Sequence, residues 1–371
     1  MIRLLIFLYI ILTPFYIFES GNIQPSHALI LILFFYYIVF INKLKINIYK
    51  NKHEKKALIF VVLFTVYVVI VNTIVSLYTD SIGSMKYTLY YLFNLIVFFL
   101  FSSLFLYKKV TISYIYVFLA ITLVSQAVLL VFGVGRTWHG YQYILFFNNP
   151  HQLGYFSLLT SSLLLMISVY KKISPQYVIP IIIVASYLSF SALSIASFIS
   201  IIVSLSFYVL HLMKRRSKFF ISTFFVFLFL SLLYGERVII ELSSNNSYVS
   251  ITSKLTTKTD RDGGWAAGRG YDTLFKEPQY LIFGMGELPG RFHNEFHSIL
   301  GNVLRSYGVV GLFLLLSFGY FIFKNKPLFC IYLFIPVLIY GLAHNGIRQP
   351  LLWIYLALVL SLPKTNSNPK K

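Results

Sequence analysis

The chain has 371 residues, of which 58% are hydrophobic, 19% aromatic and only 11% charged. A soluble domain usually has about a quarter of its residues charged, so this composition excludes an ordinary soluble fold. The formal net charge of +20 would fit a nucleic-acid-binding protein, but its distribution along the chain, described below, excludes nucleic acid as a partner.

Apolar runs of about 17 to 25 residues recur from one end of the chain to the other, each long enough to cross a bilayer. We therefore predict an all-α polytopic membrane protein, a single integral membrane domain over residues 1–371 with about 12 transmembrane helices. The first run lacks a small-residue cleavage site, so we interpret it as a span and not as a signal peptide. In chain order the predicted spans are 2–18, 27–42, 57–79, 87–107, 110–134, 154–170, 176–190, 193–213, 218–234, 298–323, 328–342 and 349–363.

The charged residues predict the orientation of these spans. With the amino terminus in the cytoplasm, the cytoplasmic segments hold 20 of the 31 basic residues and one acidic residue, Glu54. The outer segments and span ends hold 11 basic and 10 acidic residues, which nearly balance. This asymmetry follows the positive-inside rule and predicts a multi-pass protein with both termini cytoplasmic.

Three predicted outer segments differ in composition from the short, basic cytoplasmic loops. They are 135–154, a large extracytoplasmic loop over 235–297, and a short corner at 341–350. The large loop contains an aromatic-rich stretch from Trp265 to Phe283, which is suited to a short amphipathic helix lying on the membrane. Since loops of this length in compact proteins are usually functional or disordered, we interpret this one as functional.

All three outer segments carry arginine or histidine. Arginine binds phosphate through two parallel hydrogen bonds, and a histidine near neutral pKa can accept a proton from an attacking hydroxyl. Together these groups suit a reaction on a membrane-anchored diphosphate at the extracytoplasmic surface. The residues are Arg136, His139, His151, Arg261, Arg269, Arg291, His293, His297, His344 and Arg348.

The lead candidate among them is His297, at the start of a predicted membrane helix. If the helix begins at His293, then His293, His297 and Arg305 lie on one stripe, with Arg305 about 12 Å deeper than His297. If Asn294 is the N-cap instead, His293 stays in the loop. Both readings place His297 in the first turn. The His-x-x-x-His spacing lacks the glutamate of the zinc-protease motif and a third ligand, so we predict neither a metal nor another cofactor.

Carboxylates are missing from the predicted spans, and Arg305 is the one ionisable residue clearly inside them. Ion-coupled transporters usually keep carboxylates near the bilayer midplane, in interrupted helices. Their absence argues against a coupled transporter, whereas an uncoupled lipid flippase passes this test.

Four stretches resemble one family, the O-antigen ligase and Wzy-type polysaccharide polymerase superfamily of integral-membrane glycosyltransferases. Residues 297–311, HSILGNVLRSYGVVG, are similar to its signature of a histidine, an apolar helix and Gly-x-x-Gly. Residues 268–286, GRGYDTLFKEPQYLIFGMG, resemble its Gly-Arg segment, and Arg136 with residues 147–154, FNNPHQLG, its Asn-Pro-Asn stretch. Residues 344–348, HNGIR, are similar to a corner of some polymerases.

The sequence departs from the family pattern at two of these places. The family histidine is usually followed by asparagine, as at His293-Asn294, whereas the spacing to Gly308 favours His297. Both histidines stay candidates for the family role. In addition, His151 stands where asparagine is common.

The resemblance implies a GT-C-like fold and a metal-independent transfer of sugars linked to undecaprenyl diphosphate, in the cytoplasmic (inner) membrane of a bacterium. It implies that Arg136 and Arg269 hold the diphosphate and that His297 or His293 activates the acceptor hydroxyl. Further candidates for phosphate or glycan contacts are Arg291, Arg305 and Arg348.

We therefore expect a polymerase that joins lipid-linked oligosaccharide units into O-antigen, capsule or exopolysaccharide. The alternatives are a ligase that transfers a finished glycan to lipid A core or protein, and a non-catalytic flippase of lipid-linked oligosaccharides. The expected partners are undecaprenyl-diphosphate-linked oligosaccharides, membrane lipids, a chain-length regulator and a repeat-unit flippase.

Overall fold

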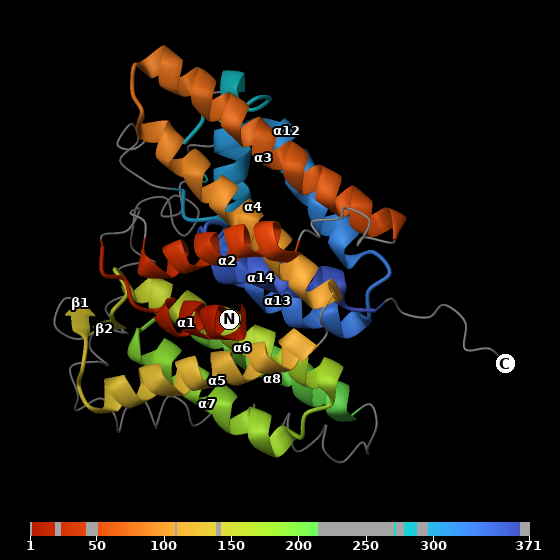
Figure 1. Cartoon of the computed structure of the whole chain (residues 1–371). Coiled ribbons are helices and arrows are strands. Elements are labelled where there is room, and N and C mark those ends of the chain that lie inside the picture. The colour runs from red at the N-terminus through yellow and green to blue at the C-terminus, as the bar shows by residue number, and fades with distance from the viewer. Residues whose placement is uncertain are drawn as a thin grey trace.

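The computed structural model describes residues 2–18, 24–41, 51–107, 110–138, 142–213, 271, 278–287 and 296–363, and every structural statement below concerns these residues (Figure 1). Within them the chain forms 11 α-helices, one two-stranded sheet and one 3-10 turn. The helices are α1 (Ile2–Leu12), α2 (Pro25–Ile41), α3 (Lys52–Thr79), α4 (Gly83–Tyr107), α5 (Val110–Val131), α6 (Pro150–Lys171), α7 (Pro175–Ser191), α8 (Ile195–Met213), α12 (Ile299–Phe323), α13 (Leu328–Ala343) and α14 (Pro350–Ser361).

Each of these helices occupies one of the predicted spans, and the span predicted at 218–234 lies outside the described residues. Six of them, α3, α4, α5, α6, α8 and α12, are long and apolar enough to cross a membrane. The other five are shorter apolar helices. The chain is thus an all-α membrane-embedded protein.

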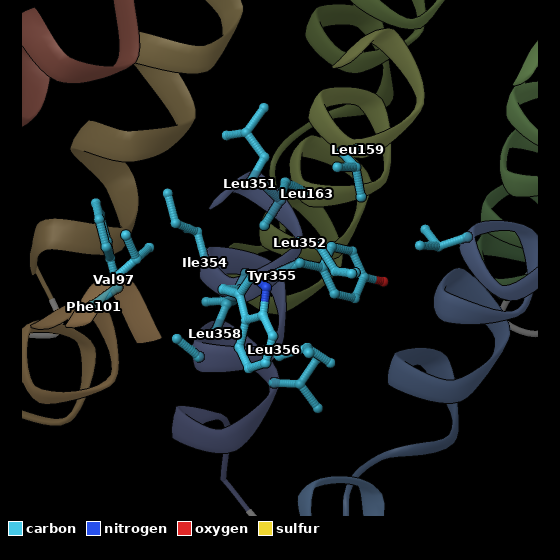
Figure 2. Close-up of a cluster of buried hydrophobic side chains, with 14 of the residues drawn as sticks. Val97, Phe101, Leu159, Leu163, Leu351, Leu352, Ile354, Tyr355, Leu356 and Leu358 are labelled. Atoms are coloured by element: carbon cyan, nitrogen blue, oxygen red, sulfur yellow. The ribbon is translucent and has the colours of Figure 1, made fainter. Parts of the chain in front are cut away.

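The apolar helix α14 forms the centre of the bundle. Figure 1 shows α13 and α14 between a group formed by α3, α4 and α12 and a second group formed by α5, α6, α7 and α8. α14 packs against α4, α6 and α12, and its residues from Pro350 to Leu360 are all buried. Figure 2 shows Leu351 of this helix beside Leu159 and Leu163 of α6, and Ile354 on the side of Val97 and Phe101 of α4. Because α14 is apolar on every side, it is stable only with helices all around it.

The first helix is shorter than predicted. α1 ends at Leu12, not at residue 18, because Pro14 has no N–H to donate and disfavours helical backbone at the preceding residue. The following residues lie against the segment after β2, where the Tyr16 N–H donates to the Phe146 carbonyl at 3.2 Å. The side chain of Gln24 then accepts from the backbone N–H groups of Ile17 and Phe18 at 3.0 and 3.1 Å.

The span predicted without interruption at 298–323 is broken inside α12. Gly308 has φ 63° and ψ −170°, a conformation that only glycine adopts readily. The segment 281–286 lies beside this break, and the Val309 N–H donates to the Leu281 carbonyl at 2.7 Å. In return the Ser306 carbonyl accepts from the Gly286 N–H at 2.9 Å. The break therefore leaves these backbone groups hydrogen-bonded, as a low-dielectric surrounding requires.

The turn between α7 and α8 is as short as predicted, spanning residues 192–194 with Leu193 at φ 50°. The sequence did not predict the antiparallel pair formed by strands β1 (Arg136–Trp138) and β2 (Gln142–Leu145). The short helix predicted within 265–283 lies largely outside the described residues, and the described part of that stretch contains one 3-10 turn, η4 (Pro278–Tyr280).

Candidate functional site

A cavity of about 500 Å³ lies where the predicted outer ends of the helices meet. Its volume is typical of a small-molecule site. It is lined by Tyr16, His27, Gly83, Lys86, Tyr87, Tyr90, Phe93, Asn149, His151, Gln152, Tyr155, His297, Tyr340, His344, Asn345, Gly346, Arg348, Gln349 and Pro350. The structure thus brings together residues that are far apart in the sequence. They meet at one end of the bundle, and the charge pattern had predicted that these helix ends lie on the same side of the membrane.

The amino-terminal ends of five helices surround this cavity. α2, α4, α6, α12 and α14 each contribute lining residues from their first turn or from the residues just before it, whereas α13 contributes its carboxyl end. A helix amino terminus carries a partial positive charge and favours an anion by about 0.3–1 kcal/mol. The backbone therefore adds to the positive potential of the cavity.

Two of the lining histidines come from different helices and pack ring to ring. The centroids of His151 on α6 and His344 after α13 lie 4.4 Å apart. His344 in turn stacks on Tyr340 at 4.7 Å, and Tyr340 on Tyr155 at 4.6 Å. The Tyr340 hydroxyl donates to the His151 carbonyl oxygen at 3.0 Å. This stack fixes the orientation of both imidazoles in the cavity wall.

His297 lies at the edge of the cavity, but not in the first turn of a helix. α12 begins at Ile299, and Ser298 is its N-cap, with Oγ accepting from the Gly301 N–H at 3.3 Å. Both predicted starts, at His293 and after Asn294, were therefore too early. Serine is a favoured N-cap residue. Because the backbone of Ser298 is extended (φ −139°, ψ 140°), the helix cannot extend further toward the amino terminus. His297 is exposed, and its neighbour Phe296 is buried.

Arg348 forms the most highly connected part of the wall. Its Nη2 forms an ion pair with Glu287 Oε2, and its guanidinium lies 4.4 Å from the ring centroid of Tyr87. The backbone carbonyl of Arg348 accepts from Asn94 Nδ2 at 3.1 Å. Burial acts to lower the pKa of Arg348, while the Glu287 carboxylate and the nearby tyrosines raise it above its ordinary value, so the guanidinium stays charged.

Lys86 is the second cation of the wall, in the first turn of α4. Its side chain is exposed. Because Glu287 compensates the charge of Arg348, the ammonium group of Lys86 supplies the net positive charge among the lysine and arginine side chains of this wall. The sequence analysis did not single out Lys86, because it is an isolated lysine in the short segment between the predicted spans 57–79 and 87–107.

Hydroxyl and amide groups complete the wall. Burial raises the pKa of Tyr16 to about 12, with the Gln349 side chain acting to lower it, so Tyr16 offers a neutral hydroxyl. The Tyr155 hydroxyl, Asn345 Oδ1 and Arg348 Nε are buried without a hydrogen-bond partner in the part of the chain that the structure describes. Each of these three residues thus brings to the cavity wall a buried polar atom that the described protein does not bind.

The other predicted site residues lie elsewhere. Arg136 is exposed on β1, and its Nη2 donates to the carbonyls of Phe146 and Phe147 at 3.1 and 3.0 Å, closing the hairpin against the start of α6. Arg305 lies on α12, with its guanidinium 5.7 Å from the ring centroid of Phe296, and it does not line the cavity. The remaining candidates, His293, Arg269 and Arg291, lie outside the described residues, as do His139 and Arg261.

Glu287 was also missed, because its position after an aromatic-rich stretch indicated an outer loop. The structure buries it in the bundle with 5% of its surface exposed. Within the described residues, no group of three or more histidine, cysteine or acidic side chains is arranged to hold a metal ion.

Comparison with protein-family models and with curated proteins finds no match to this chain. The fold and the cavity define its class as a helical membrane protein with a polar, cationic and histidine-containing site at one end of the bundle.

Proposed function

We propose that the chain is a membrane glycosyltransferase that joins oligosaccharide units carried on undecaprenyl diphosphate. The observation that carries the proposal is the cavity itself, which combines Lys86, Arg348 and four histidines with stacked aromatic rings at the amino-terminal ends of five helices. This set can bind a diphosphate, a sugar and an attacking hydroxyl in one place. The resemblance of residues 297–311 and 344–348 to polysaccharide polymerases points to the same chemistry.

The proposed reaction assigns each group a step. The acceptor hydroxyl oxygen forms a bond to the anomeric carbon of the donor sugar, the bond from that carbon to the diphosphate breaks, and its electron pair leaves with the lipid diphosphate. His297 takes the proton of the hydroxyl, because it is exposed at the mouth of the cavity. Lys86 and Arg348 stabilise the charge that develops on the departing diphosphate. Tyr87 and Tyr90 provide faces on which sugar rings can stack.

The membrane orientation belongs to the same proposal. The cavity lies at the helix ends that the positive-inside rule assigns to the outer face of the bacterial cytoplasmic membrane. Lys52, Lys55, Lys171 and Lys324 lie at the opposite ends of α3, α6 and α12. This leaves both termini in the cytoplasm and the lipid-linked donor entering from the outer leaflet.

A coupled carrier is the second candidate, because α12 is interrupted and Glu287 is a buried carboxylate, two features that such carriers use. Both features serve packing here. Glu287 is paired with Arg348 and accepts three further hydrogen bonds, and the break at Gly308 is hydrogen-bonded to segment 281–286. Neither Glu287 nor Gly308 lines the cavity. The contacts of Glu287 and Gly308 therefore favour the proposed glycosyltransferase over a coupled carrier.

The test is polymer length in a strain lacking the chromosomal copy, complemented with wild type, His297→Ala, Lys86→Gln or His211→Ala at matched membrane levels. His211 lies on α8 about 24 Å along the helix from its cavity end, so it serves as the histidine control. We expect wild type and His211→Ala to restore a ladder, and the two cavity variants to leave single units.

Ladders in all four strains would contradict the assigned roles. A wild type that transfers finished glycan to another acceptor without lengthening it would indicate the ligase, and a strain in which single units no longer reach the outer leaflet would indicate the flippase.

A further inference from the structure

Glu287 connects four parts of the bundle that are distant in sequence, three through its carboxylate and one through its backbone. Its Oε2 pairs with Arg348 just before α14. Its Oε1 accepts from the hydroxyl of Tyr91 at 3.0 Å on α4, and from Asn302 Nδ2 at 3.1 Å and the Tyr307 hydroxyl at 3.3 Å on α12. The backbone N–H of Glu287 donates to Asn72 Oδ1 on α3 at 3.2 Å. A carboxylate with this many partners has one position and one orientation.

Two contacts hold the guanidinium of Arg348, and a third holds the backbone of the same residue. Tyr87 lies against its face at 4.4 Å, Glu287 binds Nη2, and Asn94 binds the backbone carbonyl of the same residue. The face contact fixes the plane of the guanidinium, and the carboxylate fixes its rotation within that plane. Its Nε has no partner in the described chain although it is buried. The side chain of Arg348 as a whole is 29% exposed and lines the cavity, so the fixed guanidinium can meet a ligand there.

The segment that carries Glu287 is itself anchored by its backbone. The Gly286 N–H donates to the Ser306 carbonyl at 2.9 Å, and the Met285 N–H to the Arg305 carbonyl at 3.2 Å. Gly284 and Gly286 have φ of 86° and 67°, and a side chain at position 284 would collide with the backbone at Ser306. Residues 284–286 of the large loop are therefore fixed against the break in α12, which gives Glu287 a rigid base.

We propose that Glu287 is the positioning residue of Arg348, holding the guanidinium pre-oriented in the cavity wall while cancelling its net charge. Arg348 then contributes a directed hydrogen-bond donor, and the net attraction for an anion comes from Lys86 and the helix termini. The inference rests on the proposed function for the identity of the anion, the diphosphate of the lipid-linked donor. The geometry of the pair itself can be measured without turnover.

The direct measurement is modification of arginines in the purified full-length protein by phenylglyoxal, mapped by mass spectrometry. In Glu287→Gln the carboxylate no longer holds Nη2, so we expect residue 348 to react several-fold faster than in wild type. Arg136 is the internal reference, since its guanidinium is bound by carbonyls that the substitution does not touch. Glu54→Gln is the matched control, because Glu54 is also buried and hydrogen-bonded, by Asn51 Nδ2 at 2.8 Å, but at the opposite end of α3. An unchanged rate at residue 348 in a folded Glu287→Gln variant would overturn the proposal.

A second readout separates positioning from simple stabilisation. Removing the carboxylate leaves the cavity one charge more positive, so inorganic pyrophosphate should bind about three- to tenfold tighter to Glu287→Gln, while turnover of lipid-linked donor should fall at least tenfold. Weaker binding in proportion to loss of folded protein would show that Glu287 is only structural. If the labelling and pyrophosphate results come out as expected but wild type transfers no sugar, the positioning role stands and the proposed function fails.

Discussion

The imidazole rings of His151 and His344 lie with their centroids 4.4 Å apart and their planes inclined by 34°. His151 stands one residue inside α6, directly after Pro150, and His344 stands at the end of α13. Their contact joins the beginning of one helix to the end of another, and the stack continues through Tyr340 to Tyr155. The cavity wall on this side is thus a stack of four aromatic rings, and its geometry depends on a ring inside the stack that contacts a neighbour on each side.

Tyr340 provides that ring, and two substitutions separate the ring from its hydroxyl. Tyr340→Phe removes the hydrogen bond to the His151 carbonyl and should cost about 1 kcal/mol of unfolding free energy. Tyr340→Ala also leaves a cavity between His344 and Tyr155, and should cost about 3 kcal/mol. Thermal unfolding in detergent measures both. Equal losses in the two variants would show that the ring stack contributes nothing.

Lys86 should dominate the attraction of the cavity for anions. We expect Lys86→Gln to weaken binding of inorganic pyrophosphate about five- to tenfold at low salt, and the difference from wild type to shrink as ionic strength rises. Isothermal titration at two salt concentrations measures this. Lys55→Gln is the control, because Lys55 is exposed at the far end of α3, and it should match wild type. Equal affinity of Lys86→Gln and wild type would remove Lys86 from the site.

Gly308 should tolerate no side chain. Its φ of 63° is unfavourable for other residues by about 1–2 kcal/mol, and a Cβ there would collide with the Ile282 carbonyl. We expect Gly308→Ala to lower the thermal midpoint of unfolding by several degrees. Gly319→Ala on the same helix is the matched control, since a Cβ at that position meets nothing within 4 Å and alanine favours a helix by about 1 kcal/mol. A stable Gly308→Ala variant would mean that α12 is continuous.

The ion pair between Glu287 and Arg348 should show strong coupling in stability. Arg348→Gln leaves a buried carboxylate without its counter-charge, at a cost of about 3 kcal/mol. The double variant Arg348→Gln with Glu287→Gln removes both charges and should be more stable than Arg348→Gln alone. Denaturation of wild type, Arg348→Gln, Glu287→Gln and the double variant in parallel gives the coupling energy. Additive losses would show that the two side chains act independently.

The sequence predicted helix positions well because apolar runs dominate this chain. The run 87–107 became α4 and the run 349–363 became α14, since a segment this apolar has few alternatives to a buried helix. Charge asymmetry also assigned correctly to one side the helix ends that meet at the cavity, including His151, His297 and His344. Both signals are properties of whole segments, so single residues hardly affect them.

What the sequence missed depends on contacts between distant segments. The break at Gly308 depends on segment 281–286 supplying hydrogen bonds, and no pattern inside 298–323 shows that partner. The burial of Glu287 depends on Arg348, Tyr91 and Asn302 meeting it from three elements. The start of α12 at Ile299 was decided by Ser298, a better-placed cap than Asn294. Local sequence propensity does not predict such features, because contacts between distant segments determine them.

The measurement that tests the central claim most directly is reconstitution of the purified full-length protein in lipid vesicles with repeat units linked to undecaprenyl diphosphate. The account predicts a ladder of longer glycans together with release of free lipid diphosphate, both lost in His297→Ala and retained in His211→Ala. It also predicts that a protonophore leaves the yield unchanged, because no proton gradient enters the reaction. Folded wild-type protein that binds pyrophosphate but neither lengthens the glycan nor releases lipid diphosphate would contradict the account.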